Sequence, residues 1–106
     1  MKMKILRQGN VLLIMTPALP KDAAAVKTDN GDIILAYGET TGHAHRIKNP
    51  IEKAKMWDAG AERFLHVMET VALTHEEHSA INIGPGVYRV AIQTQYTPTE
   101  LRRVTD

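Results

Sequence analysis

Two histidines that stand one residue apart are the first groups in this sequence that could do chemistry. His43 and His45 lie in the segment YGETTGHAHRI. If Ala44 lies on a β-strand, the two rings point to the same face, because side chains alternate between the faces of a strand. Imidazole nitrogens bind zinc at about 2.0–2.1 Å, so rings on one face can converge on a single ion. The pair therefore indicates either a metal site or two polar side chains on a solvent-facing strand.

A second group of ionisable side chains occurs in the segment LTHEEHSAI, which contains His75, Glu76, Glu77 and His78. The segment is not an HExxH zinc motif, since only two residues separate the histidines and no long helix surrounds them. At this spacing the histidines would face opposite sides of a regular strand. We therefore expect one of them, His75 in the first instance, to join a strand-face site unless a bulge or turn intervenes.

The two segments together predict one site for a divalent metal such as zinc, iron, manganese or nickel. The candidate ligands are His43, His45, His75 and His78. The candidate catalytic groups are His45, His75 and Glu77. Because the sequence contains no cysteine, thiolate ligands, disulfides and a thiol nucleophile are excluded.

The elements that must position these groups are short strands separated by turns. A Gly9-Asn10 turn is expected between Ile5-Leu6 and the apolar run 11–15, and Asn30-Gly31 is typical of a tight hairpin turn between Val26 and residues 33–37. A further hairpin is expected around Gly60, and a long closing strand over residues 87–96. The pattern predicts a mainly β, single domain over residues 1–106, folded as a small barrel or sandwich.

One or two short helical turns are predicted from capping patterns, and the first of them is alternatively only a loop turn. Residues 49–52 and 97–100 each place a capping residue before Pro, with Glu two positions later. The second turn is expected to begin a short C-terminal helix that carries Leu101 and Val104 onto the barrel.

Composition limits the classes of partner. The 106 residues carry a net charge of +1, which provides no basic field for a nucleic acid, and no segment reaches the roughly 20 apolar residues of a membrane span. The absence of cysteine is typical of a cytoplasmic protein. A small-molecule ligand and a homo-oligomer that covers leftover apolar surface are the expected partners.

The histidine pair resembles a motif of the cupins, which are small metal-binding β-barrels. Gly38 with His43-Ala44-His45 is similar to the first cupin motif, and the segment 84–88, GPGVY, is similar to the turn of the second. The later histidines precede that turn here, whereas the cupin histidine follows it. The resemblance implies a barrel with a histidine-bound metal.

Nearly the whole chain also resembles a family of small uncharacterised bacterial and phage-associated proteins. The shared segments are RQGNVLL, GETTGHAH, LTHEEHSAI, PGVYRV and QYTPTELRRV. This resemblance implies a complete domain and brings no named activity.

Three functions from different classes are compatible with these residues. The first is a metal-binding domain that binds or transforms a small molecule through an open coordination position. The second is a non-enzymatic interaction or assembly module, accessory to a phage or mobile element, in which the histidines are structural. The third is a metal-independent enzyme in which His45 or His75 works with Glu77 in acid–base catalysis.

Overall fold

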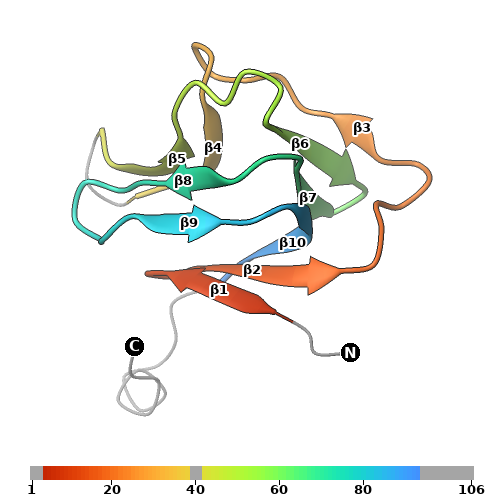
Figure 1. The fold of residues 1–106 in the computed structure, drawn as a ribbon, viewed down its shortest axis with the longest axis horizontal. Coiled ribbons are helices and arrows are strands. Elements are labelled where there is room, and N and C mark those ends of the chain that lie inside the picture. Colours follow the sequence, from red (N-terminus) through yellow and green to blue (C-terminus); the bar gives the residue numbers. More distant parts are fainter. Residues whose placement is uncertain (1–3, 39–41, 94–106) are drawn as a thin grey trace.

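The chain forms ten short strands and no helix within residues 4–38 and 42–93, the part that the computed structural model describes. The strands follow one another with tight turns or short loops between them (Figure 1). Their bounds are β1 Ile5–Gln8, β2 Val11–Thr16, β3 Ala24–Ala25, β4 Ile33–Tyr37, β5 Ala44–Ile47, β6 Ala54–Ala59, β7 Glu62–Val67, β8 Val71–Leu73, β9 Ile81–Ile83 and β10 Gly86–Ile92. The mainly β class predicted from the sequence is confirmed.

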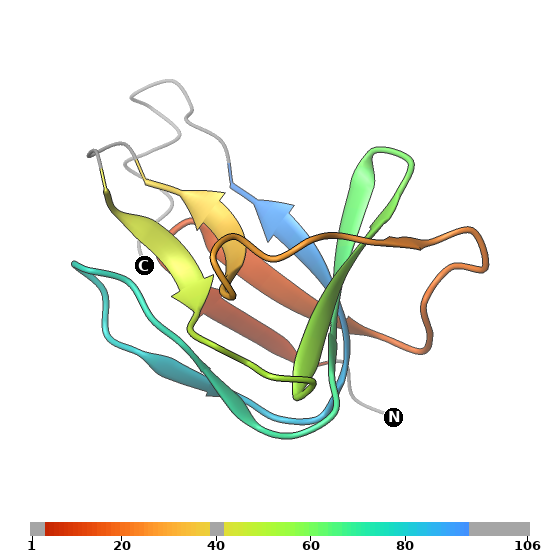
Figure 2. The same ribbon diagram turned by 90° about the horizontal axis from the view of Figure 1, so that it is seen from above.

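Six of these strands form one antiparallel sheet in the order β1-β2-β10-β7-β6-β3, and β4-β5 and β8-β9 form two smaller sheets. Backbone hydrogen bonds between Arg46 and Thr74 join the two small sheets. Both views place the small sheets against one side of the curved larger sheet (Figure 2). Apolar side chains from both parts fill the space between them, and those fully buried include Leu13, Leu35, Ile47, Leu65, Leu73, Ile83 and Tyr88.

The strands do not close into a barrel, so the predicted barrel is wrong. Within the described residues β4 has a strand partner, β5, on one side only. On the other side the guanidinium of Arg63 donates hydrogen bonds to the carbonyls of Ile34 and Leu35, at 3.4 and 3.2 Å. A side chain therefore satisfies the backbone acceptors that a neighbouring strand would bind in a closed barrel.

The predicted turns are confirmed, but one hairpin differs from the prediction. Gly9-Asn10 and Gly60-Ala61 are two-residue loops between paired strands. Asn30 and Gly31 take φ values of +53° and +87°, as a type I′ turn requires. Beyond the bridge that flanks this turn the two arms separate, because residues 24–26 bond to β6 while β4 pairs with β5.

Residues 49–52 do not form the predicted helical turn. Asn49, Ile51 and Glu52 have φ values of +47°, +39° and +61°, which lie outside the right-handed helical region. The amide of Asn49 donates a 2.8 Å hydrogen bond to the carboxylate of Asp32, which fixes this loop conformation.

The predicted C-terminal helix and the end of the predicted closing strand lie outside the described residues. No helix in the described part of the chain has the length and apolar character needed to cross a bilayer.

Candidate functional site

The four histidines proposed as ligands meet where the start of β5 faces the loop between β8 and β9. The ring centroid of His75 lies 4.3 Å from that of His45, 4.7 Å from that of His78 and 5.9 Å from that of His43. The rings of His45 and His78 are 5.7 Å apart. We call His43, His45, His75 and His78 the histidine cluster. The fifth histidine, His66 on β7, has no ring contact with the cluster.

Both histidines of the second segment join the cluster because the segment is not a strand. β8 ends at Leu73 and β9 begins at Ile81, so His75 and His78 lie in the connecting loop, where strand alternation does not apply. The sequence predicted that only one of these two histidines would join the site unless a bulge or turn intervened, and the loop provides that interruption. In the first segment His45 lies on β5 with only 3% of its surface exposed, while His43 precedes the strand and is partly exposed.

Gln8, at the end of β1, connects three parts of the site. Its Nε2 donates to the carbonyls of Leu73 and Ser79, at 2.9 and 3.0 Å, and its Oε1 lies 2.8 Å from Nδ1 of His45. Because an amide oxygen can only accept a hydrogen bond, Nδ1 of His45 carries a proton and donates it. In the neutral ring, Nε2 therefore keeps its lone pair.

Burial keeps His45 neutral at pH 7. Desolvation, followed by the nearby His75 and His78, lowers the pKa of His45 from its ordinary value of 6.5 to about 4, against a smaller opposite effect of Glu76. Since a metal binds imidazole only in its deprotonated form, a ring that is already neutral is suited to coordination.

The two glutamates of the loop have different partners. Glu76 accepts a 2.9 Å hydrogen bond from the amide of Ala44, which is the main reason that the pKa of this carboxyl is lowered. Glu77, which we predicted as an acid–base partner of His45 or His75, has its carboxylate 3.1 Å from Nδ1 of His43. The backbone amide of Glu77 donates a 2.9 Å hydrogen bond to Nδ1 of His75. The loop is thus bound to the start of β5 and to one ring of the cluster.

Gln8 is a residue of the site that is not among the candidates predicted from the sequence. A signal for it was present, because Gln8 shares a strand face with Leu6 and is a polar residue at an inward position. Gln8 is 3% exposed, and an uncharged polar side chain buried to this extent needs hydrogen-bond partners. Two of its three partners come from β8 and the loop after it, more than 60 residues along the chain, and the third is His45 on β5.

The rings of the cluster do not share one orientation. The planes of His45 and His78 differ by 17°, so this pair is stacked, whereas His75 is tilted by 40° against His45 and by 52° against His78 and meets His43 edge-on at 86°. Imidazole lone pairs lie in the ring plane, so stacked rings direct them past one another. Accordingly, no three His, Asp or Glu side chains of the described residues are arranged around one point as metal ligands. Because Gln8 holds the ring of His45, an ion at Nε2 of His45 could bind a second imidazole only if other rings of the cluster turned toward it.

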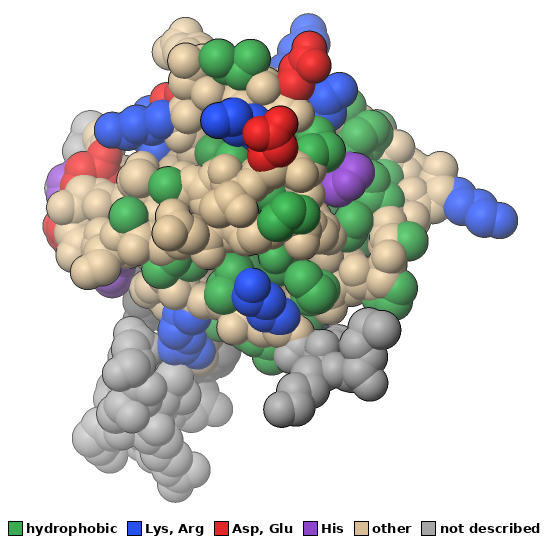
Figure 3. All heavy atoms as spheres, viewed as in Figure 1, with side chains coloured by type: hydrophobic (Ala, Val, Ile, Leu, Met, Phe, Trp, Pro, Cys, Tyr) green, Lys and Arg blue, Asp and Glu red, His purple; other side chains and the backbone are tan. Residues whose placement is uncertain are grey.

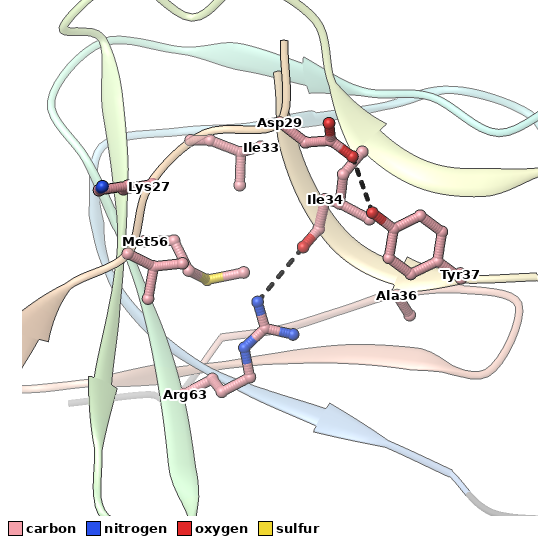
Figure 4. A pocket seen from close by; sticks show the side chains of 9 residues that line it. Lys27, Asp29, Ile33, Ile34, Ala36, Tyr37, Met56 and Arg63 are labelled. Atoms are coloured by element: carbon pink, nitrogen blue, oxygen red, sulfur yellow. Dashed lines mark hydrogen bonds between the residues drawn. The ribbon is translucent and has the colours of Figure 1, made fainter. Parts of the chain in front are cut away.

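A separate cavity of about 210 Å³ lies at the open side of β4. Its apolar lining includes Ile33 and Met56, and Arg63 reaches across it to the backbone of β4 (Figure 4). Tyr37 closes one side through a 2.8 Å hydrogen bond from its hydroxyl to Asp29. No histidine lines this cavity, so it is distinct from the cluster.

The surface in Figure 3 shows charged side chains of both signs interspersed with apolar ones.

Comparison with known proteins identifies a family without a described activity. No curated protein and no solved structure matches the chain, and the resemblance to cupins is not supported. A family model described as a domain of unknown function (DUF8820) matches residues 7–93. This span includes Gln8, the histidine cluster and both glutamates. The chain belongs to the DUF8820 family, which agrees with the expectation of an uncharacterised family.

Proposed function

We propose that the histidine cluster binds one divalent transition-metal ion, at which a small molecule is bound or transformed. The observation that carries this proposal is the hydrogen bond between Gln8 and His45, which holds a buried, neutral imidazole in the tautomer with a free Nε2 lone pair. Metal-ligating histidines almost always donate their other ring N–H to an oxygen acceptor in this way.

A second histidine has the same type of support. The carboxylate of Glu77 faces Nδ1 of His43, so the proton is held on Nδ1 and Nε2 is left free in the neutral ring. An all-imidazole donor set suits zinc, iron or nickel better than magnesium or calcium, which prefer oxygen. The donor chemistry supports a transition metal as the occupant.

The low pKa of His45 favours a ligand over a general base. A general base works best when its pKa lies near the operating pH, whereas the pKa of His45 is lowered to about 4. A ring this weakly basic accepts a proton poorly at neutral pH but still offers a lone pair to a metal. The low pKa therefore argues against His45 as the general base of a metal-independent enzyme.

The proposal is tested by elemental mass spectrometry of the purified, tag-free protein before and after reconstitution with zinc, iron, manganese and nickel salts. We expect close to one metal ion per chain. In His45→Asn the side-chain amide can still donate to Gln8 but offers no imidazole lone pair, and we expect its metal affinity to fall by at least about 100-fold. The double variant His43→Ala/His45→Ala should lose the metal entirely.

His66→Asn is the matched control, because it removes a histidine outside the cluster. It should keep the metal content of the unchanged protein. Absence of metal from the folded, reconstituted protein would refute the proposal, and a stable oligomer in that sample would favour the interaction module. Equal metal loss in His66→Asn and His45→Asn would assign the binding to unspecific surface histidines.

A pair of glycines provides a further test of the cluster's geometry. Gly9 and Gly60 each begin a two-residue hairpin loop, with φ values of +57° and +63°. A Cβ on Gly9 would lie 2.6 Å from Nε2 of His78, whereas a Cβ on Gly60 would meet nothing within 4 Å. Replacement by alanine should cost each loop a similar amount, about 1 kcal/mol of stability. Only Gly9→Ala must displace a ring of the cluster.

We therefore expect Gly9→Ala to lower the metal affinity about tenfold, with Gly60→Ala close to the unchanged protein. Isothermal titration with zinc measures the affinity, and urea unfolding measures the stability of both variants. Equal zinc affinities in the two variants, at matched stability, would show that the position of His78 does not matter for binding.

A further inference from the structure

The cavity at the open side of β4 is apolar over most of its wall. Its apolar lining comes from β4, β6 and the segment before β4, namely Val26, Ile33, Ile34, Ala36 and Met56. The exposed side chains of Lys27 and Tyr37 lie at its rim (Figure 4). An apolar cavity of about 150 Å³ can hold a benzene molecule. At about 210 Å³, this one has room for a benzene ring with a small polar group attached.

A bulge in β4 positions Arg63 at this cavity. The register with β5 shifts between Ile34 and Ala36, so Leu35 is an extra residue in β4. In a regular strand the carbonyls of neighbouring residues point to opposite edges. Here those of Ile34 and Leu35 both accept a hydrogen bond from Arg63, at 3.4 Å from Nη2 and 3.2 Å from Nη1. The guanidinium is therefore held in place before a ligand arrives.

The guanidinium of Arg63 retains N–H donors for a ligand. Its terminal nitrogens each carry a pair of N–H groups, and only one of each pair is used on β4. The remaining nitrogen, Nε, lies 3.6 Å from Oδ1 of Asp58, which is longer than a hydrogen bond. Among the described residues, the second N–H of each terminal nitrogen has no acceptor. Arginine donors of this kind favour carboxylate and phosphate oxygens.

The charges around the cavity favour a ligand with a single negative charge. The charged lining residues are Lys27, Asp29 and Arg63, which leave one net positive charge. The carboxylate of Asp29 accepts a 2.8 Å hydrogen bond from the hydroxyl of Tyr37, so it has a partner of its own. A monocarboxylate balances the net charge of the lining, whereas a phosphate monoester, with a charge of about −2, exceeds it.

We propose that this cavity binds a small monocarboxylate with an apolar body about the size of a benzene ring. The carboxylate accepts hydrogen bonds from the second N–H groups of Arg63, and the body lies against Ile33 and Met56. Because the methionine side chain is unbranched and flexible, this wall adapts to the shape of the body. No residue of the histidine cluster lines the cavity, so the site goes beyond the proposed metal-binding function and does not depend on it.

The test is a titration of the full chain, treated with chelator so that no metal binds the probe, followed by two-dimensional amide NMR. The probes are benzoate and benzamide, which have nearly the same shape but differ in charge. We expect benzoate to shift the amide signals of β4 and β6 with a dissociation constant on the order of 1 mM, typical of so small a ligand. Benzamide should bind about tenfold more weakly, because it lacks the charge-assisted hydrogen bond.

Two pairs of variants locate the binding. Arg63→Gln should bind both probes equally, whereas Arg89→Gln should keep the preference for benzoate. The two arginines are matched, since both have side chains 40% exposed and face a carboxylate, but Arg89 lies on β10 outside the cavity. Ala36→Leu adds an isopropyl group to the cavity wall and should weaken benzoate binding at least about tenfold. Ala91→Leu, at a half-buried position on β10, should leave it unchanged.

Absence of benzoate binding, equal affinity of the unchanged protein for the two probes, or an undiminished preference in Arg63→Gln would overturn the proposal. Undiminished benzoate binding in Ala36→Leu would place the ligand outside this cavity and overturn it as well. If Arg63→Gln does not fold, the alanine variants and the comparison of the two probes on the unchanged protein still decide. None of these results depends on metal binding by the histidine cluster.

Discussion

Replacement of Gln8 by alanine should lower the free energy of unfolding by about 3 kcal/mol, because it leaves three groups without their partner. These groups are the carbonyls of Leu73 and Ser79 and the Nδ1–H of His45. The contacts of Gln8 with the carbonyl of Leu73 and with His45 are buried, where a polar group left unsatisfied costs about 1–3 kcal/mol, while the carbonyl of Ser79 is only partly buried. Without Gln8 the ring of His45 is also free to turn, so the metal affinity should fall about 10- to 100-fold. Urea unfolding and zinc titration measure the two effects.

Two further variants separate the roles of the Gln8 amide. Gln8→Glu keeps an oxygen that can accept from His45 but sets a second oxygen against the carbonyls of Leu73 and Ser79, so it should destabilise the fold at least as much as alanine. Gln93→Ala removes a glutamine that makes no side-chain hydrogen bond to the described residues, and we expect a loss below about 0.5 kcal/mol. Similar small losses in Gln8→Ala and Gln93→Ala would show that the Gln8 contacts contribute little.

The strand content could be predicted because local signals determine it. Gly9 and Gly60 mark hairpins whose arms are adjacent in sequence, and Asn30-Gly31 adopts the turn that its residue types favour. The failure at residues 49–52 has a long-range cause. The capping pattern there is local, but a carboxylate from Asp32 captures the amide of Asn49 and holds a different backbone conformation.

The openness of the fold could not be read from periodicity, because periodicity does not tell which strand edges pair. Arg63 looks like a surface residue in the sequence, yet it bridges from β7 to the carbonyls of β4. The candidate ligands could be identified from residue type and strand spacing. Their proximity in the fold, however, depends on the loop after β8 and on Gln8 from β1. Contacts between segments this far apart are set by the packed fold and not by local sequence.

Acidification should destabilise the metal-free protein through His45. In the unfolded chain this ring takes up a proton near its ordinary pKa of 6.5, whereas in the folded protein burial and the neighbouring His75 and His78 lower the pKa to about 4. The unfolded state therefore binds more protons between these two values. The stabilisation is complete above about pH 6.5 and is lost as the pH falls through about 4, amounting to about 3 kcal/mol over this interval.

The contribution of His45 is isolated by comparing urea unfolding from pH 7.5 to 4 in chelator-treated samples. His45→Asn retains a donor for Gln8 but does not titrate, so its free energy of unfolding should fall less steeply with decreasing pH. The difference in slope should reach at most the value for one proton, about 1.4 kcal/mol per pH unit. His66→Asn leaves His45 and its neighbours intact and should keep the steeper fall. If His45→Asn and the unchanged protein show parallel curves, protonation of His45 costs the fold nothing. The low pKa of His45, which supports its role as a neutral metal ligand, would then be refuted. The hydrogen bond to Gln8 would be the remaining support for that role.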